Sequence, residues 1–279
     1  MKHIYTAAGQ PASRTVTIAD MRSAKGQRKL VQVTANTADE AMAVQEAGID
    51  MMICDAANAH IVRAANPTTF CTAAVKLTEH ATTDDIMREA YRVMHLGVDA
   101  IITPRSFKTV EILAREDIPV MGHLGLVPRK SIWLGGLRAV GKTATEAQRL
   151  FRDFKSLEDA GAFAVESEVI AGPVMAEIAP RTSLICVSLG SGSGGDVTFL
   201  FMNDLCGETA NPPRHARAFG NLAALHEALY KARVQALNDF RVAALEGEFP
   251  TVAQTPTLDD NELAIFRKAL QSEQTPTAG

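Results

Sequence analysis

The sequence has little that points to a nucleic acid, a membrane or an oxidising compartment. Its 279 residues carry a formal net charge of −4, so no basic field attracts nucleic acid or anionic lipid. No apolar run approaches the length of a membrane-spanning helix, and the first residues lack the apolar stretch of a secretory signal. The four cysteines have no CxxC spacing, so we expect reduced, mostly buried thiols in a cytoplasmic protein.

What the sequence does have is a regular alternation of short apolar runs and helical patterns. This alternation predicts a parallel sheet with crossover helices. Two helix starts carry the capping-box pattern, Thr37 with Glu40 and Thr143 with Glu146. The predicted strands are Lys29–Thr34, Asp50–Cys54, Phe70–Val75, Asp99–Ile102, Pro119–Met121, Ala162–Val165, Ser183–Val187 and Val197–Met202.

Eight evenly spaced strands favour one closed (β/α)8 TIM barrel, for which the chain length is typical. The alternative is an open doubly wound sheet, but no GxGxxG motif follows the first strand. We predict a single barrel domain over residues 1–250. Residues 251–279 are polar and rich in Thr and Pro, which predicts a mobile tail.

Barrel enzymes build their sites from residues at the carboxyl ends of the strands. Glu166 and Glu168 end one strand and share one face because side chains alternate along it, but the sequence does not say which of them faces the barrel. The polar types at the strand ends suit acid–base chemistry on a small oxyacid, with or without a metal. The candidates are Asp55, Lys76, Glu79, His80, Thr103, Arg105, Ser106, His123, Glu166, Glu168, Ser188, Ser191, Ser193, Asn203 and Asp204.

Several candidates also have a purely structural interpretation. Asp55 could cap the segment that follows it, and His123 could be a hydrogen-bonded core histidine. His80 lies beside a predicted helix start and could be a surface residue. The stretch SLGSGSGG at 188–195 could cradle a phosphate or carboxylate with backbone N–H groups, or it could be a flexible loop.

Several segments together resemble the ketopantoate hydroxymethyltransferase family. VMGHLGLVP at 120–128 is similar to the family's GHLGL segment, and IDMMICD at 49–55 is similar to a strand that ends in a metal-binding Asp. The resemblance spans about residues 15–250. Further matches, in the family's order, are LGG at 134–136, LEDAGAF at 157–163, NDLCG at 203–207, PRHARAF at 213–219 and EGEFP at 246–250.

The resemblance implies a (β/α)8 barrel of the phosphoenolpyruvate/pyruvate-type superfamily, assembled as a homo-oligomer. It implies transfer of a hydroxymethyl group from methylenetetrahydrofolate to 3-methyl-2-oxobutanoate, a step in pantothenate biosynthesis. In the family a divalent metal, usually Mg²⁺, chelates the 2-oxo acid and stabilises its enolate. By resemblance, Asp55 is the metal-ligand position, Glu168 is the acid/base position, and His123 lies next to the substrate.

The chain departs from the family pattern at the other metal and substrate positions. The family's Asp-Ser pair is Asp55-Ala56 here, and its second metal-binding Asp falls on Ala74. Its Lys and Glu after the fourth strand fall on Ile102 and Pro104. One carboxylate is a poor Mg²⁺ site, because this ion is usually held by one or two carboxylates together with substrate oxygens.

Cationic side chains occur near the lost positions. A fixed cation can stabilise a developing enolate, and Arg binds carboxylates through two hydrogen bonds. We therefore predict that Arg105, with Lys76 or His80, replaces the metal. The alternative is that Arg105 forms an ordinary loop salt bridge.

Three functions remain open at this point. The first is ketopantoate hydroxymethyltransferase or a close variant of it. The second is a metal-independent aldolase or lyase acting on another 2-oxo acid, and the third is a non-catalytic relative that kept the barrel. For the two enzymatic functions, the predicted catalytic residues are Glu168, His123 and Arg105, and the predicted substrate-binding residues are Lys76, His80 and Ser188.

Overall fold

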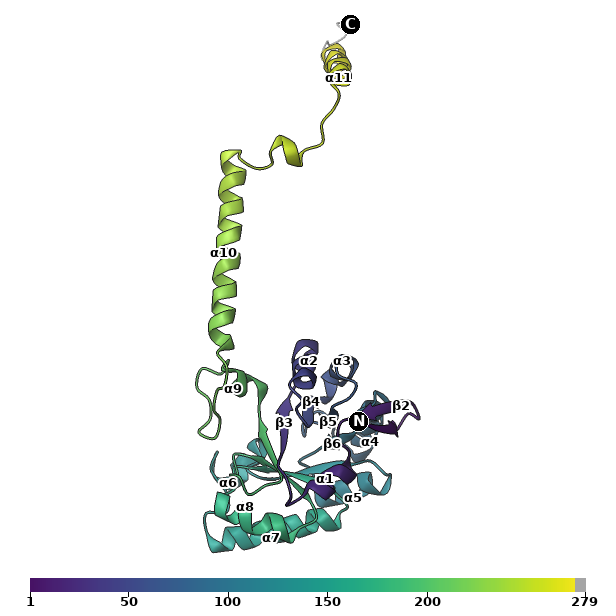
Figure 1. The fold of residues 1–279 in the computed structure, drawn as a ribbon, viewed down its shortest axis with the longest axis vertical. Helices are drawn as coiled ribbons and strands as arrows, with labels where there is room; N and C mark the ends of the chain where they lie inside the picture. Colours follow the sequence, from purple (N-terminus) through teal and green to yellow (C-terminus); the bar gives the residue numbers. More distant parts are fainter. Residues whose placement is uncertain (274–279) are drawn as a thin grey trace. The chain divides into compact units, whose positions relative to one another are not determined.

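Eight parallel strands close into a barrel in the computed structural model, which describes residues 1–273 (Figure 1). The strands follow one another around the barrel in chain order, and β10 pairs with both β9 and β3. The predicted barrel is therefore confirmed, and the open sheet is excluded. The strands are β3 (Leu30–Thr34), β4 (Met51–Asp55), β5 (Phe70–Ala74), β6 (Ala100–Ile102), β7 (Val120–Gly125), β8 (Ala164–Glu168), β9 (Ile185–Leu189) and β10 (Val197–Leu200).

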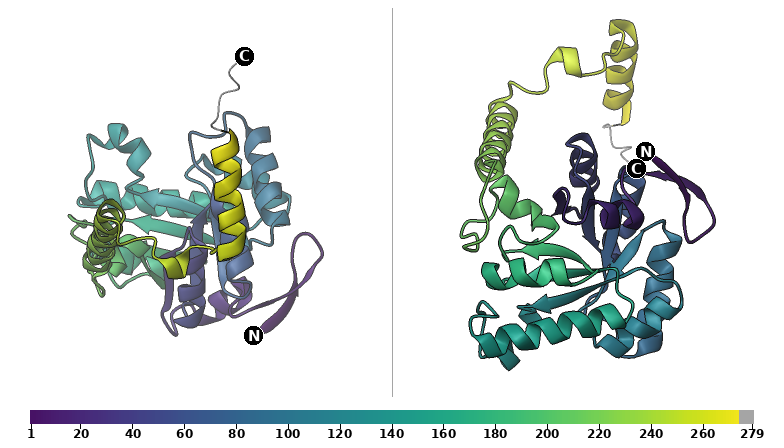
Figure 2. Two further views of the ribbon diagram at one scale, coloured as in Figure 1. Left: turned by 90° about the horizontal axis from the view of Figure 1, so that it is seen from above. Right: turned by 60° about the horizontal axis from the view of Figure 1, so that its bottom comes forward.

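Helices alternate with these strands and lie outside the barrel (Figure 2). The capping box of Thr37 and Glu40 is present in full. Thr143 also caps its helix, but the Glu146 carboxylate accepts from the N–H groups of Gly141 and Lys142. The helices of this part are α1 (Ile18–Ala24), α2 (Ala38–Glu46), α3 (Ala59–Ala65), α4 (Thr83–His95), α5 (Phe107–Arg115), α6 (Ser131–Leu134), α7 (Ala144–Asp159), α8 (Gly172–Ile178) and α9 (Met202–Cys206), with short 3₁₀ turns η1 (Ala56–Asn58), η2 (Pro128–Lys130) and η3 (Ala179–Arg181).

The core has two layers because successive side chains of a strand point to opposite faces of the sheet. One layer fills the barrel interior and includes Met51, Phe70 and Met121. The other lies between the sheet and the helices and includes Phe154 and Leu157. The last inward-facing positions of the strands therefore open at the carboxyl end of the barrel, where a site is expected. All four cysteines are free thiols, as predicted.

A two-stranded hairpin that the sequence did not predict precedes the barrel. It consists of β1 (Lys2–Tyr5) and β2 (Pro11–Arg14). At its end, Arg14 Nε lies 2.7 Å from Asp99 Oδ1, and Arg63 Nη1 lies 3.3 Å from Asp99 Oδ2. These buried charges pair with one another, and the ion pairs tie the hairpin to the barrel.

The contacts of the chain separate it into two units, residues 1–221 and the segment from Leu222 onward. The second unit contains α10 (Leu222–Glu246), η4 (Val252–Gln254) and α11 (Asp260–Glu273). The sequence interpretation put the end of the barrel domain at residue 250 and did not identify α11. The predicted mobility of the tail stays a prediction, and residues 274–279 lie outside the described part. No helix within the described residues is long and apolar enough to cross a bilayer.

Candidate active site

A cavity of about 540 Å³ lies at the carboxyl ends of the barrel strands. Its charged and imidazole side chains come from different elements: Asp55 at the end of β4, Lys76 after β5, His123 on β7, Arg129 in η2, Glu166 on β8 and Asp204 in α9. Asn36 and Asn203 also line the cavity, together with the apolar side chains of Ile53, Ile102 and Phe199. The location agrees with the rule for barrel sites.

An ion pair occupies one wall of the cavity. Lys76 Nζ lies 3.3 Å from Asp55 Oδ2 and 3.4 Å from Glu79 Oε1. The hydrogen bond and the charge of Asp55 raise the pKa of Lys76, so this ammonium stays protonated at neutral pH. The backbone N–H of Asp55 donates to Asn36 Oδ1 at 2.8 Å, which fixes the end of β4.

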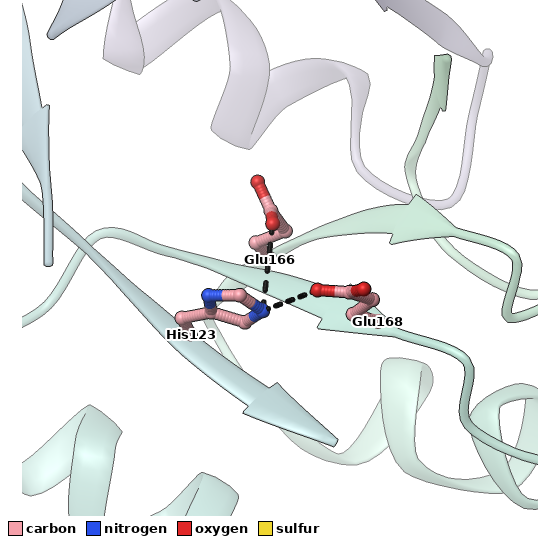
Figure 3. A group of neighbouring side chains, drawn as sticks. All are labelled: His123, Glu166 and Glu168. Carbon is pink, nitrogen blue, oxygen red and sulfur yellow. Dashed lines mark hydrogen bonds and ion pairs between the residues drawn. The ribbon is translucent and has the colours of Figure 1, made fainter. Parts of the chain in front are cut away.

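A second group consists of His123, Glu166 and Glu168 (Figure 3). His123 Nε2 lies 2.9 Å from Glu168 Oε2 and 3.5 Å from Glu166 Oε1, so both carboxylates approach the same ring nitrogen. Burial lowers the pKa of His123, but the two carboxylates outweigh burial and the net shift is upward. Burial also raises the pKa of Glu166, against the opposing effect of His123. Three titratable side chains thus meet at one ring nitrogen, an arrangement that suits proton transfer.

The wall at Asp55 does not fit a Mg²⁺ ion. Asp55 on β4 is in register with Ala74 on β5, and Ala74 is in register with Ile102 on β6. These are the positions where the resemblance implies a metal-binding Asp, a second metal-binding Asp and a Lys. Here one carboxylate stands beside two apolar side chains and is paired with an ammonium, which leaves too few oxygen ligands for a hard cation.

The His123 group, by contrast, has the donor types of a divalent-cation site. One imidazole nitrogen and two carboxylate oxygens lie within 4.8 Å of one another. Nitrogen and carboxylate donors suit first-row transition metals. Two of these atoms, His123 Nε2 and Glu168 Oε2, also share a hydrogen bond. The arrangement therefore suits proton transfer as well as metal binding.

Arg105 lies beside the cavity and does not line it. Its Nη2 donates to the backbone carbonyls of Leu77, at 3.0 Å, and His80. Its Nε is buried without a hydrogen-bond partner. Arg105 instead lines a second cavity, of about 620 Å³, together with Lys130 and His123. His123 therefore stands between the two cavities.

Two other predicted substrate-binding residues are not brought to the first cavity. The His80 side chain is not among its lining residues, and neither is Ser188. Ser188 donates its hydroxyl proton to Gly192 O at 2.7 Å. Ser191 donates to Ser167 O and accepts from Ile170 N–H, so hydrogen bonds hold the glycine-rich stretch in place.

Lys130 was missed by the sequence interpretation. It donates to the carbonyl of Pro104, and burial lowers its pKa. It lies in the long loop after β7, where no periodicity indicates which side chains turn inward. Glu166 was a strand-end candidate but received no role, because the resemblance placed the acid/base function on Glu168.

The fold and these groups define the class of (β/α)8 barrels whose acidic, imidazole and cationic side chains gather at the carboxyl ends of the strands. The sequence model of the ketopantoate hydroxymethyltransferase family matches residues 56–252, and the chain belongs to that family.

Two relatives show how far the similarity extends. The 3-methyl-2-oxobutanoate hydroxymethyltransferase of Nitratidesulfovibrio vulgaris (strain DP4) is 28% identical over 95% of this chain and 94% of its own length. The protein of that name from Hyperthermus butylicus is 31% identical over 84% of this chain and 88% of its own. Among solved structures, the carboxyl transferase domain of Rhizobium etli pyruvate carboxylase has a TM-score of 0.52 at 8% identity, covering 73% of this chain and 47% of that one. This last likeness concerns the fold alone.

Proposed function

We propose that the protein makes or breaks a carbon–carbon bond next to a 2-oxo acid by way of an enolate. The observation that carries the proposal is the placement of an ammonium, Lys76, and a proton-transferring group, His123 with its glutamates, on the same cavity. Enolate chemistry needs both a positive charge near the oxo group and an acid/base group near the adjacent carbon.

The substrate would bind with its negative charge toward Lys76. When a base removes a proton from C3, the C–H electron pair forms the C2–C3 double bond and the carbonyl pair moves onto oxygen. The Lys76 ammonium stabilises that oxyanion. The enolate carbon can then attack an electrophile, and the reverse sequence breaks the same bond.

His123 and Glu168 form the proposed proton-transfer pair, since they share a hydrogen bond of 2.9 Å. Arg105 is proposed to support the cation: it holds the carbonyls of Leu77 and His80 and so fixes the segment that carries Lys76. His80 and Ser188, predicted from the sequence to bind substrate, do not line the cavity in which the substrate is proposed to lie. The homo-oligomer also stays a prediction, which mass photometry of the purified chain would test.

Hydroxymethyl transfer to 3-methyl-2-oxobutanoate is the first reaction to assay, because the relatives are named for it. It would use methylenetetrahydrofolate as the one-carbon donor. The second candidate, a lyase or aldolase that needs no added metal, is favoured by the Asp55–Lys76 pair, which places an organic cation where the family is expected to hold Mg²⁺.

Calorimetric titration with 3-methyl-2-oxobutanoate tests the proposal, with and without Mg²⁺, on the wild type and on Asp55→Ala. Binding in the absence of Mg²⁺ supports a site organised by Lys76. Binding that requires both Mg²⁺ and Asp55 would show that the family's metal site persists. Absence of binding for this and for shorter 2-oxo acids would leave a non-catalytic relative as the better account.

A further inference from the structure

The two glutamates of β8, Glu166 and Glu168, differ in whether they line the first cavity. Glu166 lines the cavity that also holds Asp55, Lys76 and His123, whereas Glu168 is not among the described residues that line it. Both side chains point to the interior side of the sheet, and β8 pairs with β7 so that Glu166 lies opposite His123 and Glu168 lies opposite Gly125. A ligand held by Lys76 in this cavity therefore meets the carboxylate of Glu166.

Their partners differ as well. Glu168 Oε2 accepts the 2.9 Å hydrogen bond of His123. The side chain of Glu166 is 8% exposed, and within residues 1–273 it accepts no hydrogen bond. Its Oε1 lies 3.5 Å from His123 Nε2.

A buried carboxylate without hydrogen bonds is unfavourable for folding. Within the described residues, Glu166 thus has only the charge of His123 as a partner, and its position on the cavity points to a ligand.

We infer that Glu166 is the catalytic carboxylate of this site and that Glu168 is a positioning residue, which holds the ring of His123 in place. This inference rests on the proposed function and changes which glutamate touches the substrate. In the step described above, the proton from C3 forms an O–H bond with the Glu166 carboxylate, while the C–H electron pair enters the enolate.

The surroundings of Glu166 suit this step. Burial raises its pKa, which makes its carboxylate a stronger base than an exposed glutamate. Taking up the proton also removes a buried charge. The charges that shift the pKa of Glu166 are those of His123 on β7 and Glu168 on β8. Lys130, after β7, acts on His123. Lys130 opposes protonation of His123, and both glutamates favour it.

Deuterium exchange at C3 of 3-methyl-2-oxobutanoate in D₂O, followed by proton NMR, tests the inference. We expect Glu166→Gln to lower the exchange rate by about 100-fold or more, while calorimetric affinity for the same 2-oxo acid changes by less than about threefold. Glu168→Gln should lower the rate by about tenfold and shift its pH profile, because His123 loses its hydrogen-bond partner. Glu177→Gln, on an exposed glutamate of α8, is the matched control and should leave the rate unchanged.

The outcomes separate the two proposals. Wild-type protein that neither binds nor exchanges the 2-oxo acid contradicts the proposed function, and this inference with it. Wild-type exchange that survives in Glu166→Gln and is lost in Glu168→Gln overturns the inference alone. Exchange that is abolished by EDTA and restored by Mn²⁺ also overturns it, because the three side chains would then be metal ligands.

If Glu166→Gln does not fold, as judged by circular dichroism, Glu166→Asp replaces it. This variant keeps the charge but has a side chain one methylene shorter, which moves the carboxylate away from the substrate. An exchange rate within twofold of the wild type in Glu166→Asp would contradict a direct proton transfer.

Discussion

The carboxylate of Asp55 lies 3.3 Å from the ammonium of Lys76, and this ion pair joins the end of β4 to the segment after β5. A permanent cation thus stands at the wall where the resemblance implies a divalent metal. The neighbouring strand positions, Ala74 and Ile102, supply no ligand. In the proposed function, this ammonium supplies the positive charge that an enolate oxygen needs.

Replacing Lys76 with Met should weaken binding of 3-methyl-2-oxobutanoate by about 10- to 100-fold, because a charge-assisted contact to the anion is lost while most of the side-chain volume remains. Calorimetry without added metal measures the effect. Lys108→Met, at an exposed position of α5, is the control. Equal affinities for the wild type and Lys76→Met would show that Lys76 does not bind the substrate.

Replacing Arg105 with Ala should lower kcat/KM by about 100-fold, on the scale of misplacing a substrate-contacting group by about 1 Å. The carbonyls of Leu77 and His80 lose their guanidinium partner, so the segment carrying Lys76 should also become more mobile. Hydrogen–deuterium exchange of peptides spanning 76–82 reports that change. An unaltered rate would mean that Arg105 is neither a catalytic residue nor needed to hold Lys76.

Replacing Gly125 with Ala should destabilise the barrel by about 3 kcal/mol or more. The backbone φ of Gly125 is +91°, and an added Cβ would lie 2.3 Å from the carbonyl oxygen of Glu168. Gly135→Ala is the matched control, since its φ is +75° and no atom lies within 4 Å, so that change carries only the backbone strain of about 1 kcal/mol. Urea unfolding of both variants measures the difference, and equal midpoints would rule out the steric argument.

Acid should weaken the fold through Glu158 at the end of α7. Burial would raise the pKa of this carboxyl, but hydrogen bonds from Lys155 and Ser183 outweigh it and bring the pKa to about 2 from 4.5. Because the folded-state pKa is the lower one, the stabilisation is complete above about pH 4.5 and is lost as the pH falls toward 2.

The contribution at neutral pH is at most about 3–4 kcal/mol. Glu158→Gln should therefore unfold at lower urea concentration at pH 7 and approach the wild type near pH 2, with Glu177→Gln as the control. A constant difference between the two proteins across this pH range would assign the loss to something other than the charge.

The strands could be predicted because each is a short apolar run between helical patterns, and their observed bounds differ from the predicted ones by at most a few residues. The hairpin was not predictable in the same way. Its strands, KHIY and PASR, are four residues each and largely exposed, so they carry no apolar alternation. What attaches it is a long-range contact, Arg14 to Asp99, which no local pattern reveals.

The sequence predicted which residues lie at the carboxyl ends of the strands, but not how their side chains are arranged. Asp55, Lys76 and His123 meet in one cavity because parallel strands share a carboxyl edge. Alternation put Glu166 and Glu168 on one face but could not separate them, since the difference depends on height along the barrel and on one hydrogen bond. The direction of the Arg105 side chain depends on carbonyls that lie more than twenty residues away in sequence, and spacing does not encode it.

His123 lines both cavities, and this has a thermodynamic consequence. A ligand in one cavity that changed the charge or orientation of the imidazole would also change the surface that a ligand in the other cavity contacts. If a ligand in the first cavity alters affinity for a ligand in the second by some factor, the second must alter the first by the same factor. Ligands in the two cavities would contact the same imidazole, and their binding affinities would then depend on each other.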